Sequence, residues 1–124
     1  MTGNGLADYL DHMQRAATDA LAFVGGLNKA DFGNDKRTQQ AVVMSLIIIG
    51  EVAAKVMDRR AGFAARRPDV PWRSMRGMRN RIAHGYFDIN LDVVWDTVQT
   101  ALPALLKQLH TIHDEAADDA DDER

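Results

Sequence analysis

Residues 41–57 read "AVVMSLIIIGEVAAKVM", an apolar segment around which the other parts of the chain must pack. The three consecutive isoleucines at positions 47–49 would point in three directions around a helix, so one partner face cannot bury all of them. Alanines and two charged residues continue a helical pattern past Gly50, which disfavours the rival interpretation of "LIIIG" as a buried strand. We therefore expect a helix over about residues 38–60 that lies at the centre of a bundle or faces a second subunit.

Three further segments carry apolar residues at spacings of three and four, the pattern of amphipathic helices. They cover about residues 6–24, 72–83 and 91–112, and glycines, prolines and other turn residues separate them. Pro103 lies inside the last segment and should bend it. The sequence thus predicts an all-α fold, an up-and-down four-helix bundle with a kinked last helix.

The chain of 124 residues is long enough for one domain with a single modest core. We expect residues 1–113 to form this domain and residues 114–124, "DEAADDADDER", to form a disordered acidic tail. The absence of cysteine excludes disulfides, thiolate catalysis and zinc sites built on cysteine. No signal peptide is visible and the apolar run "LIIIG" is too short to span a membrane, so a cytoplasmic protein without a membrane partner is expected.

Positive charge is concentrated in the middle of a chain whose net charge is −3. Between residues 59 and 81, only Asp69 opposes a set of eight arginines: Arg59, Arg60, Arg66, Arg67, Arg73, Arg76, Arg79 and Arg81. Such a cluster is typical of proteins that bind an anion or a nucleic acid. A solvated helix face would produce the same pattern, and charge alone does not separate the two interpretations.

The segment "MRNRIAHGYF", residues 78–87, places Arg79 and His84 close to a helix end. Five residues apart on an unbroken helix, the two would be separated by about 140° around the axis. We expect Gly85 to end the helix near His84 and so release the histidine from this constraint. A histidine can then move a proton while the arginine stabilises charge on a phosphodiester, and RNA supplies its own nucleophile, the 2′-hydroxyl. Taken alone, R-x4-H is a very weak pattern, and most such pairs would be a surface arginine and a capping or core histidine.

The longer stretch "MRNRIAHGYFDINLDVVW" resembles the signature of the HepT-like group of the HEPN superfamily, which carries an R-x4-H-x-Y motif, usually with asparagine after the arginine. The stretches "DKRTQQAVVMSLIIIGEVAAKV" and "PDVPW" resemble the second helix of that family and the entry to its motif helix. The similarity covers about residues 6–109.

This resemblance implies the toxin of a type II toxin–antitoxin pair, a metal-independent endoribonuclease that needs no cofactor. Arg79 and His84 match the catalytic positions of the family, and Asn80 matches a supporting polar position. Tyr86 matches the tyrosine that the partner antitoxin, an MntA-type nucleotidyltransferase, modifies with AMP to silence the toxin. Family members are homodimers in which the two motif helices line a shared cleft, so the resemblance implies a homodimer here.

Several residues around the motif have both a functional and a structural interpretation. Arg73, Arg76 and Arg81 are candidates for binding the RNA backbone, or belong to a solvated face. Glu51 could orient an arginine across the bundle, or be a partly exposed helix residue. His110 and His113 have no convincing third ligand, so we expect no metal site.

Two other functions are compatible with the sequence. The protein could be a helical binding partner and AMP acceptor of a nucleotidyltransferase, or a nucleotide-binding regulator, without cleaving RNA. It could also be a helical dimer with a purely structural role.

Overall fold

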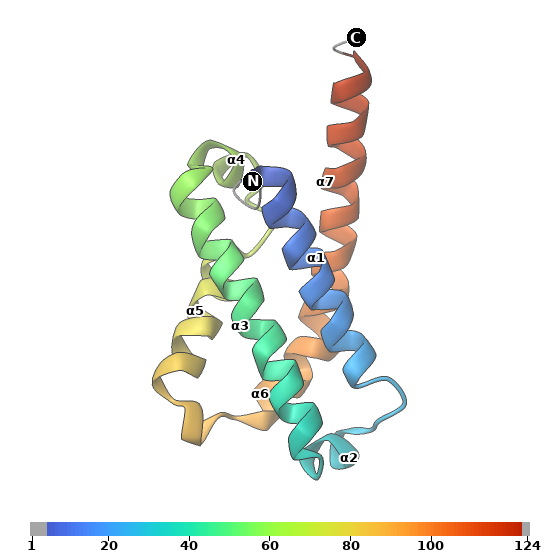
Figure 1. Ribbon diagram of the computed structural model, residues 1–124, viewed down its shortest axis with the longest axis vertical. Coiled ribbons are helices and arrows are strands. Elements are labelled where there is room, and N and C mark those ends of the chain that lie inside the picture. The colour runs from blue at the N-terminus through green and yellow to red at the C-terminus, as the bar shows by residue number, and fades with distance from the viewer. Residues whose placement is uncertain (1–4, 123–124) are drawn as a thin grey trace.

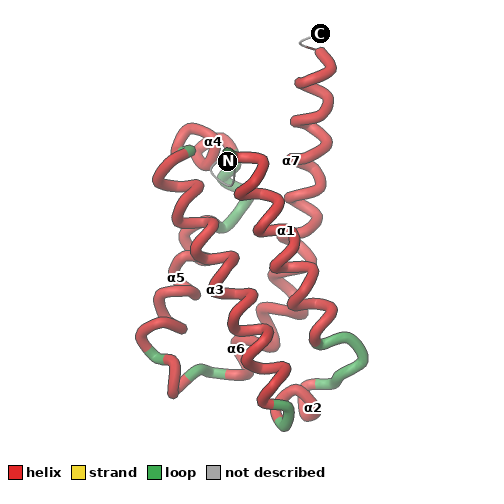
Figure 2. The backbone as a smooth tube through the Cα atoms, viewed as in Figure 1, coloured by secondary structure: helices red, strands yellow, loops and turns green. Residues whose placement is uncertain are grey.

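The computed structural model describes residues 5–122, with the side chains of Tyr86 and of residues 116–122 outside that description. Helices joined by short connections make up this part of the chain, and no strand occurs in it (Figures 1 and 2). The elements in chain order are α1 (Leu6–Phe23), α2 (Lys29–Gly33), α3 (Lys36–Arg59), α4 (Ala61–Arg66), α5 (Trp72–His84), the 3₁₀ turn η1 (Tyr86–Asp88), α6 (Leu91–Asp96), the π-helical segment η2 (Thr97–Ala101) and α7 (Leu102–Asp122). The prediction of an all-α bundle is confirmed. The short helices α2 and α4 lie in segments that the sequence indicated only as connections.

Helix α3 is the centre of the fold. It packs against α1 along one side and against α5 along another, and α7 packs on α1 (Figure 1). The three isoleucines diverge as expected, because Ile49 is 2% exposed, Ile47 is partly buried and Ile48 remains 39% exposed. By length and composition alone α3 could cross a membrane, but half of that apolar window is buried inside the bundle.

The contact between α3 and α5 depends on Gly50. A Cβ atom built at this position would collide with the Cβ atom of Arg79 and would lie 2.7 Å from the carbonyl oxygen of Met75. Because both obstacles belong to the body of α5 rather than to a flexible side-chain end, α5 can approach this closely only where α3 has no side chain. The glycine therefore sets the distance between the two helices at the level of Arg79.

The last helix changes its hydrogen bonding just before Pro103. In η2 the N–H of Leu102 donates to the carbonyl oxygen of Thr97, the longer-range bond of a π-helix. Proline cannot donate to the preceding turn, and its ring would clash with the carbonyl group one α-helical turn earlier. The π-helical turn is a recognised way of accommodating such a disruption without ending the helix. The irregularity expected at Pro103 thus lies in the turn that precedes it.

The C-terminal part of the chain differs from the expectation. Helix α7 continues to Asp122 and extends past the other helices in Figure 1, whereas the sequence suggested an end near Ile112 followed by disorder from Asp114. Residues 114–122 are helical, and only residues 123–124 of the expected tail lie outside the described chain. An ion pair between Glu115 and Arg67 fastens the first turn of this acidic segment to the bundle.

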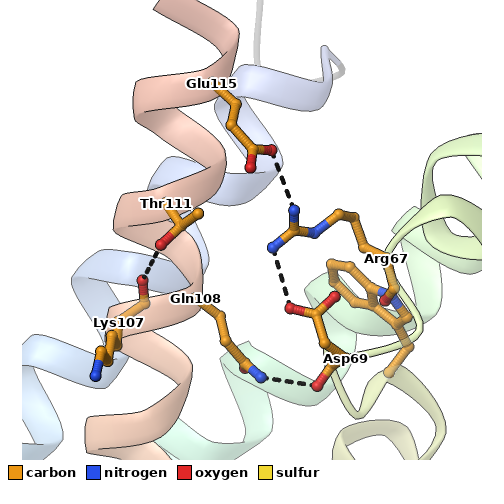
Figure 3. A network of polar contacts seen from close by, with 7 residues as sticks. Arg67, Asp69, Lys107, Gln108, Thr111 and Glu115 are labelled. Atoms are coloured by element: carbon orange, nitrogen blue, oxygen red, sulfur yellow. Dashed lines mark hydrogen bonds and ion pairs between the residues drawn. The ribbon is translucent and has the colours of Figure 1, made fainter.

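Arg67 organises the connection between α4 and α5 (Figure 3). Its guanidinium group donates to Asp69 at 3.0 Å and to Glu115 of α7 at 3.1 Å, while Gln108 of α7 donates to the carbonyl oxygen of Asp69 at 2.7 Å. The indole N–H of Trp72 donates to the carbonyl oxygen of Arg67 at 3.1 Å. These bonds tie the start of α5 to the last helix.

We predict that Gly50→Ala lowers the free energy of unfolding by about 1–3 kcal/mol, the usual cost of forcing extra atoms into a packed contact. Gly77→Ala in α5 is the matched control, because its Cβ would meet only the end of the Arg81 side chain, at 3.4 Å. Alanine is the better helix former by roughly 1 kcal/mol, so this variant should be as stable as the parent or more so. Urea unfolding measures both variants, and a Gly50→Ala protein of unchanged stability would contradict the close approach.

Candidate functional site

Helix α5 carries most of the residues that the sequence singled out. Pro71 precedes it, and Gly85 follows it, with the N–H of Gly85 donating to the carbonyl oxygen of Arg81 at 2.9 Å. The expectation that the helix ends near His84 at Gly85 is confirmed, but His84 is itself the last helical residue, so it is not released from helical geometry. Arg79 and His84 therefore remain about 140° apart around the axis of α5.

Arg79 is held by two neighbours. Its Nη1 donates to Oε1 of Glu51 on α3 at 2.7 Å, and its Nε donates to Oδ1 of Asn80 at 3.0 Å. The Arg79 side chain is 22% exposed and that of Glu51 is 51% exposed, so the pair lies at the edge of the α3–α5 contact. Of the two interpretations of Glu51, the structure bears out the contact with an arginine. Asn80 also contacts the arginine, as a supporting residue would.

His84 is more accessible to solvent than Arg79. It is exposed at the end of α5 and forms no hydrogen bond or ion pair with any described side chain. The 3₁₀ turn η1 follows at once and contains Tyr86, whose side chain lies outside the described structure, and Phe87, which is 95% exposed. The imidazole is thus open to a ligand that approaches the end of α5.

One face of α5 combines the histidine with two arginines. Arg76 and His84 are eight residues apart, which places them within about 80° of each other around the helix axis. Arg73 and Asn80 fall inside the same sector, and both are exposed. Arg79 lies about 60° outside this sector, on the side towards α3. We call Arg73, Arg76, Asn80 and His84 the polar face of α5.

The remaining candidates lie elsewhere. Arg81 is exposed and lines the apolar space between α5 and the last helix, beside Met78 and Leu105, about 60° from His84 around the axis of α5. Trp72 is 5% exposed and packs edge-on against Phe63, with ring centroids 6.1 Å apart, so it belongs to the core. His110 lies 3.2 Å from the side-chain nitrogen of Gln14. Among the described residues, histidines and carboxylates form no group of three that could hold a metal ion.

The sequence interpretation missed Gly50. A glycine inside a helix costs roughly 1 kcal/mol relative to alanine, so its presence in the middle of an apolar helix signals a packing or functional reason. Here that reason is the approach of Arg79, which brings the guanidinium group within reach of the neighbouring Glu51.

Comparison with known proteins assigns the family. Residues 13–112 match the family model described as "Ribonuclease HepT-like". A relative from Thermococcus cleftensis named "Probable ribonuclease HepT" is 36% identical over 79% of this chain and 86% of its own length. A relative from Methanocaldococcus jannaschii named "Putative RNase" is 34% identical over 86% of this chain and 83% of its own length. No solved structure gives a significant match. The chain belongs to the HepT-like ribonuclease family.

We predict that Glu51→Gln lowers the turnover number for RNA cleavage by roughly ten- to a hundredfold, because it would release Arg79, to which the family resemblance assigns a catalytic position, and a catalytic group that is misplaced loses rate steeply with distance. Stability should change by less than about 1 kcal/mol, since the ion pair is partly exposed to solvent. Asp11→Asn is the control, because it removes the same charge from the ion pair with Arg15 on α1. A Glu51→Gln enzyme with full turnover would show that Arg79 needs no such support.

Proposed function

We propose that the protein is a metal-independent endoribonuclease that uses Arg79 and His84. The observation that carries the proposal is the arrangement on α5, in which a guanidinium group fixed by Glu51 and Asn80 lies on the same helix as a free imidazole, five residues before it. An arginine in a fixed position can stabilise charge on a phosphate without reorganising during the reaction.

The proposed reaction is attack by the ribose 2′-oxygen on the adjacent phosphorus. His84 accepts the proton of the 2′-hydroxyl, the bond from phosphorus to the 5′-oxygen breaks, and that oxygen takes up a proton from water, while His84 returns its proton to solvent. Arg79 stabilises the negative charge that accumulates on the non-bridging oxygens. The products are a 2′,3′-cyclic phosphate and a free 5′-hydroxyl. Asn80 and Glu51 support the reaction by holding the guanidinium group.

We predict that His84→Ala and Arg79→Ala each reduce RNA cleavage by at least about a hundredfold, the usual contribution of a general base or of a charge-stabilising donor. Cleavage by the parent protein should persist in EDTA and leave cyclic phosphate ends. His110→Ala is the control, because it removes a histidine outside the motif helix. Retention of activity in His84→Ala would overturn the mechanism, and RNA binding without turnover in the parent would favour the non-catalytic alternative.

We also propose that the protein acts as a homodimer through an apolar surface on α3 and η1. Met44 is 56% exposed and Phe87 is 95% exposed, and together with Ile47 they line a groove of about 600 Å³. Ile48, one turn beyond Met44 on α3, extends the surface and is 39% exposed. Burial of such residues against a second copy would remove apolar area from water. The groove borders η1 and so brings the interface next to His84.

We predict that Met44→Glu converts the dimer to a monomer, because a carboxylate would be buried without a partner in the interface. Phe23→Glu is the matched control, since Phe23 is a similarly exposed apolar residue at the end of α1, 44% exposed. Sedimentation velocity distinguishes the two outcomes, and circular dichroism checks that both variants fold. A Met44→Glu protein that remains dimeric would place the interface elsewhere.

The proposed biological role is that of a toxin in the cytoplasm, silenced by an MntA-type nucleotidyltransferase that adds AMP to Tyr86. What supports the role of Tyr86 is its place in η1, two residues after His84. An AMP group attached there would bring bulk and a negative phosphate close to the imidazole and to the arginines of α5, where it would compete with the phosphate of RNA.

We predict that Tyr86→Phe keeps ribonuclease activity but escapes this silencing, because the variant has no hydroxyl group to accept AMP. Co-expression with the nucleotidyltransferase should rescue growth of cells that make the parent protein and fail to rescue cells that make the variant. Intact-mass measurement detects the adduct on the parent protein. If the nucleotidyltransferase silences the Tyr86→Phe variant through its catalytic activity, another residue accepts AMP.

A further inference from the structure

A second groove opens beside the first half of α5. It has a volume of about 590 Å³ and lies between the end of α3, helix α4 and the start of α5. Apolar groups form much of its wall, among them Met57 and Val70. The side chains of Arg73 and Arg76 also line it. The size is that of a site for a small organic ligand, which typically occupies roughly 300–1,000 Å³.

The groove carries an uncompensated positive charge. Arg73 and Arg76 form no ion pair or hydrogen bond with any described residue. Two other arginines of this region are engaged, since Arg67 pairs with Asp69 and Arg79 pairs with Glu51. Asp58, which is exposed, is the one acidic residue in the lining, against two arginines. Two guanidinium groups without carboxylate partners favour binding of a phosphate group.

The groove is continuous with the proposed catalytic face. Arg73 and Arg76 are both members of the polar face of α5, so they point to the same side of the helix as His84. Along the helix axis, Arg76 lies about 12 Å from His84 and Arg73 about 16 Å, at 1.5 Å per residue. A stacked nucleic-acid strand advances about 3.4 Å per nucleotide, so this distance corresponds to roughly four nucleotides, or fewer in an extended strand.

We propose that this groove binds one nucleotide of the RNA substrate, two to four nucleotides away from the bond that is cut, by the spacing just given. Arg73 and Arg76 hold its phosphate, and its base lies against the apolar wall near Met57 and Val70. Asp58 accepts a hydrogen bond from a base amino group or a ribose hydroxyl. The proposal rests on the ribonuclease function proposed above and adds to it a defined binding site for the substrate strand away from the reacting phosphate.

The network around Arg67 gives this site a rigid wall. The segment 67–71 between α4 and α5 contributes Pro68, Val70 and Pro71 to the groove. The bonds from Arg67 to Glu115 and from Gln108 to the Asp69 carbonyl fasten this segment to α7 (Figure 3). The site is therefore preformed in the free protein, which lowers the cost of ordering it when a ligand binds.

The test uses oligonucleotides with a single ribonucleotide in an otherwise 2′-O-methyl strand, so that cleavage can occur at one bond only. The strand is lengthened one nucleotide at a time on either side of that bond. For the parent protein, kcat/KM should rise when the strand becomes long enough to reach the groove, and on one side only. The double variant Arg73→Ala/Arg76→Ala should not show this rise. On long substrates its kcat/KM should be lower than that of the parent by about tenfold or more, because its KM is higher. Its cleavage of the shortest substrates should fall much less than its cleavage of long ones.

Two further variants test whether the effect on long substrates is specific to the groove. Arg15→Ala on α1 removes the same charge from a residue paired with Asp11 and should leave the length dependence unchanged. Ala61→Phe fills the groove without changing charge, and it should weaken cleavage of long substrates as the double variant does. Circular dichroism verifies that each variant folds.

The outcomes separate the groove from the function itself. A parent protein that cuts no RNA of any length would overturn the proposed ribonuclease function. A parent protein that cuts short and long strands equally well would overturn the proposal that the groove binds RNA, but not the proposed ribonuclease function. An equal loss on all lengths in the double variant would show that these arginines act on the reacting phosphate. Unchanged cleavage combined with lost binding of the nucleotidyltransferase would assign the groove to a protein partner.

Discussion

The contact of Arg79 with Gly50 is the constraint on which the candidate site depends. Because α3 has no side chain at this point, the body of α5 lies against its backbone, and the Arg79 side chain emerges beside Glu51. Any added atom at position 50 would move α5 outwards and with it the polar face that contains His84. Packing and chemistry are thus joined at one position, since the helix contact that stabilises the bundle also directs the guanidinium group.

The arginines of the basic segment have different tasks, although the sequence presents them as one cluster. Arg67 is bound to Asp69 and Glu115 and fixes a loop, whereas Arg59 donates to the hydroxyl group of the buried Tyr9. Arg79 is held in place by a carboxylate, and Arg73 and Arg76 have no protein partner among the described residues. Charge counted along the sequence therefore overstates the surface that is free to attract RNA. The part that remains free includes the arginines of the polar face of α5, which also line the groove beside it.

Periodicity alone predicted the helical class and, except for the end of the last helix, the bounds of the long helices to within a few residues, because apolar spacing reports the face that each helix buries. It could not predict the contact between Glu51 and Arg79, because residues 28 positions apart meet only through the register of α3 on α5. Gly85 ends α5 as expected, but His84 is still the last residue of the helix. The expected release of His84 from helical geometry would have required the helix to end before His84. The acidic composition of the C-terminal segment suggested disorder, but alanines and the anchor at Glu115 allow α7 to continue.

The π-helical turn in the last helix has a consequence for how its two halves share one core. Val94, Val98 and Leu102 are all buried and follow one another at intervals of four, an interval that drifts by about 40° per step on a regular α-helix. The wider turn at Thr97–Ala101 takes up the surplus residue, so all three side chains stay in phase with the same interior. The buried positions before and after the turn therefore lie on the same side of the helix only because the turn contains one extra residue. Insertion or loss of one residue between positions 97 and 101 would rotate the buried face of α7 relative to that of α6. The rotation would move α7, with its anchor to Arg67, away from the bundle.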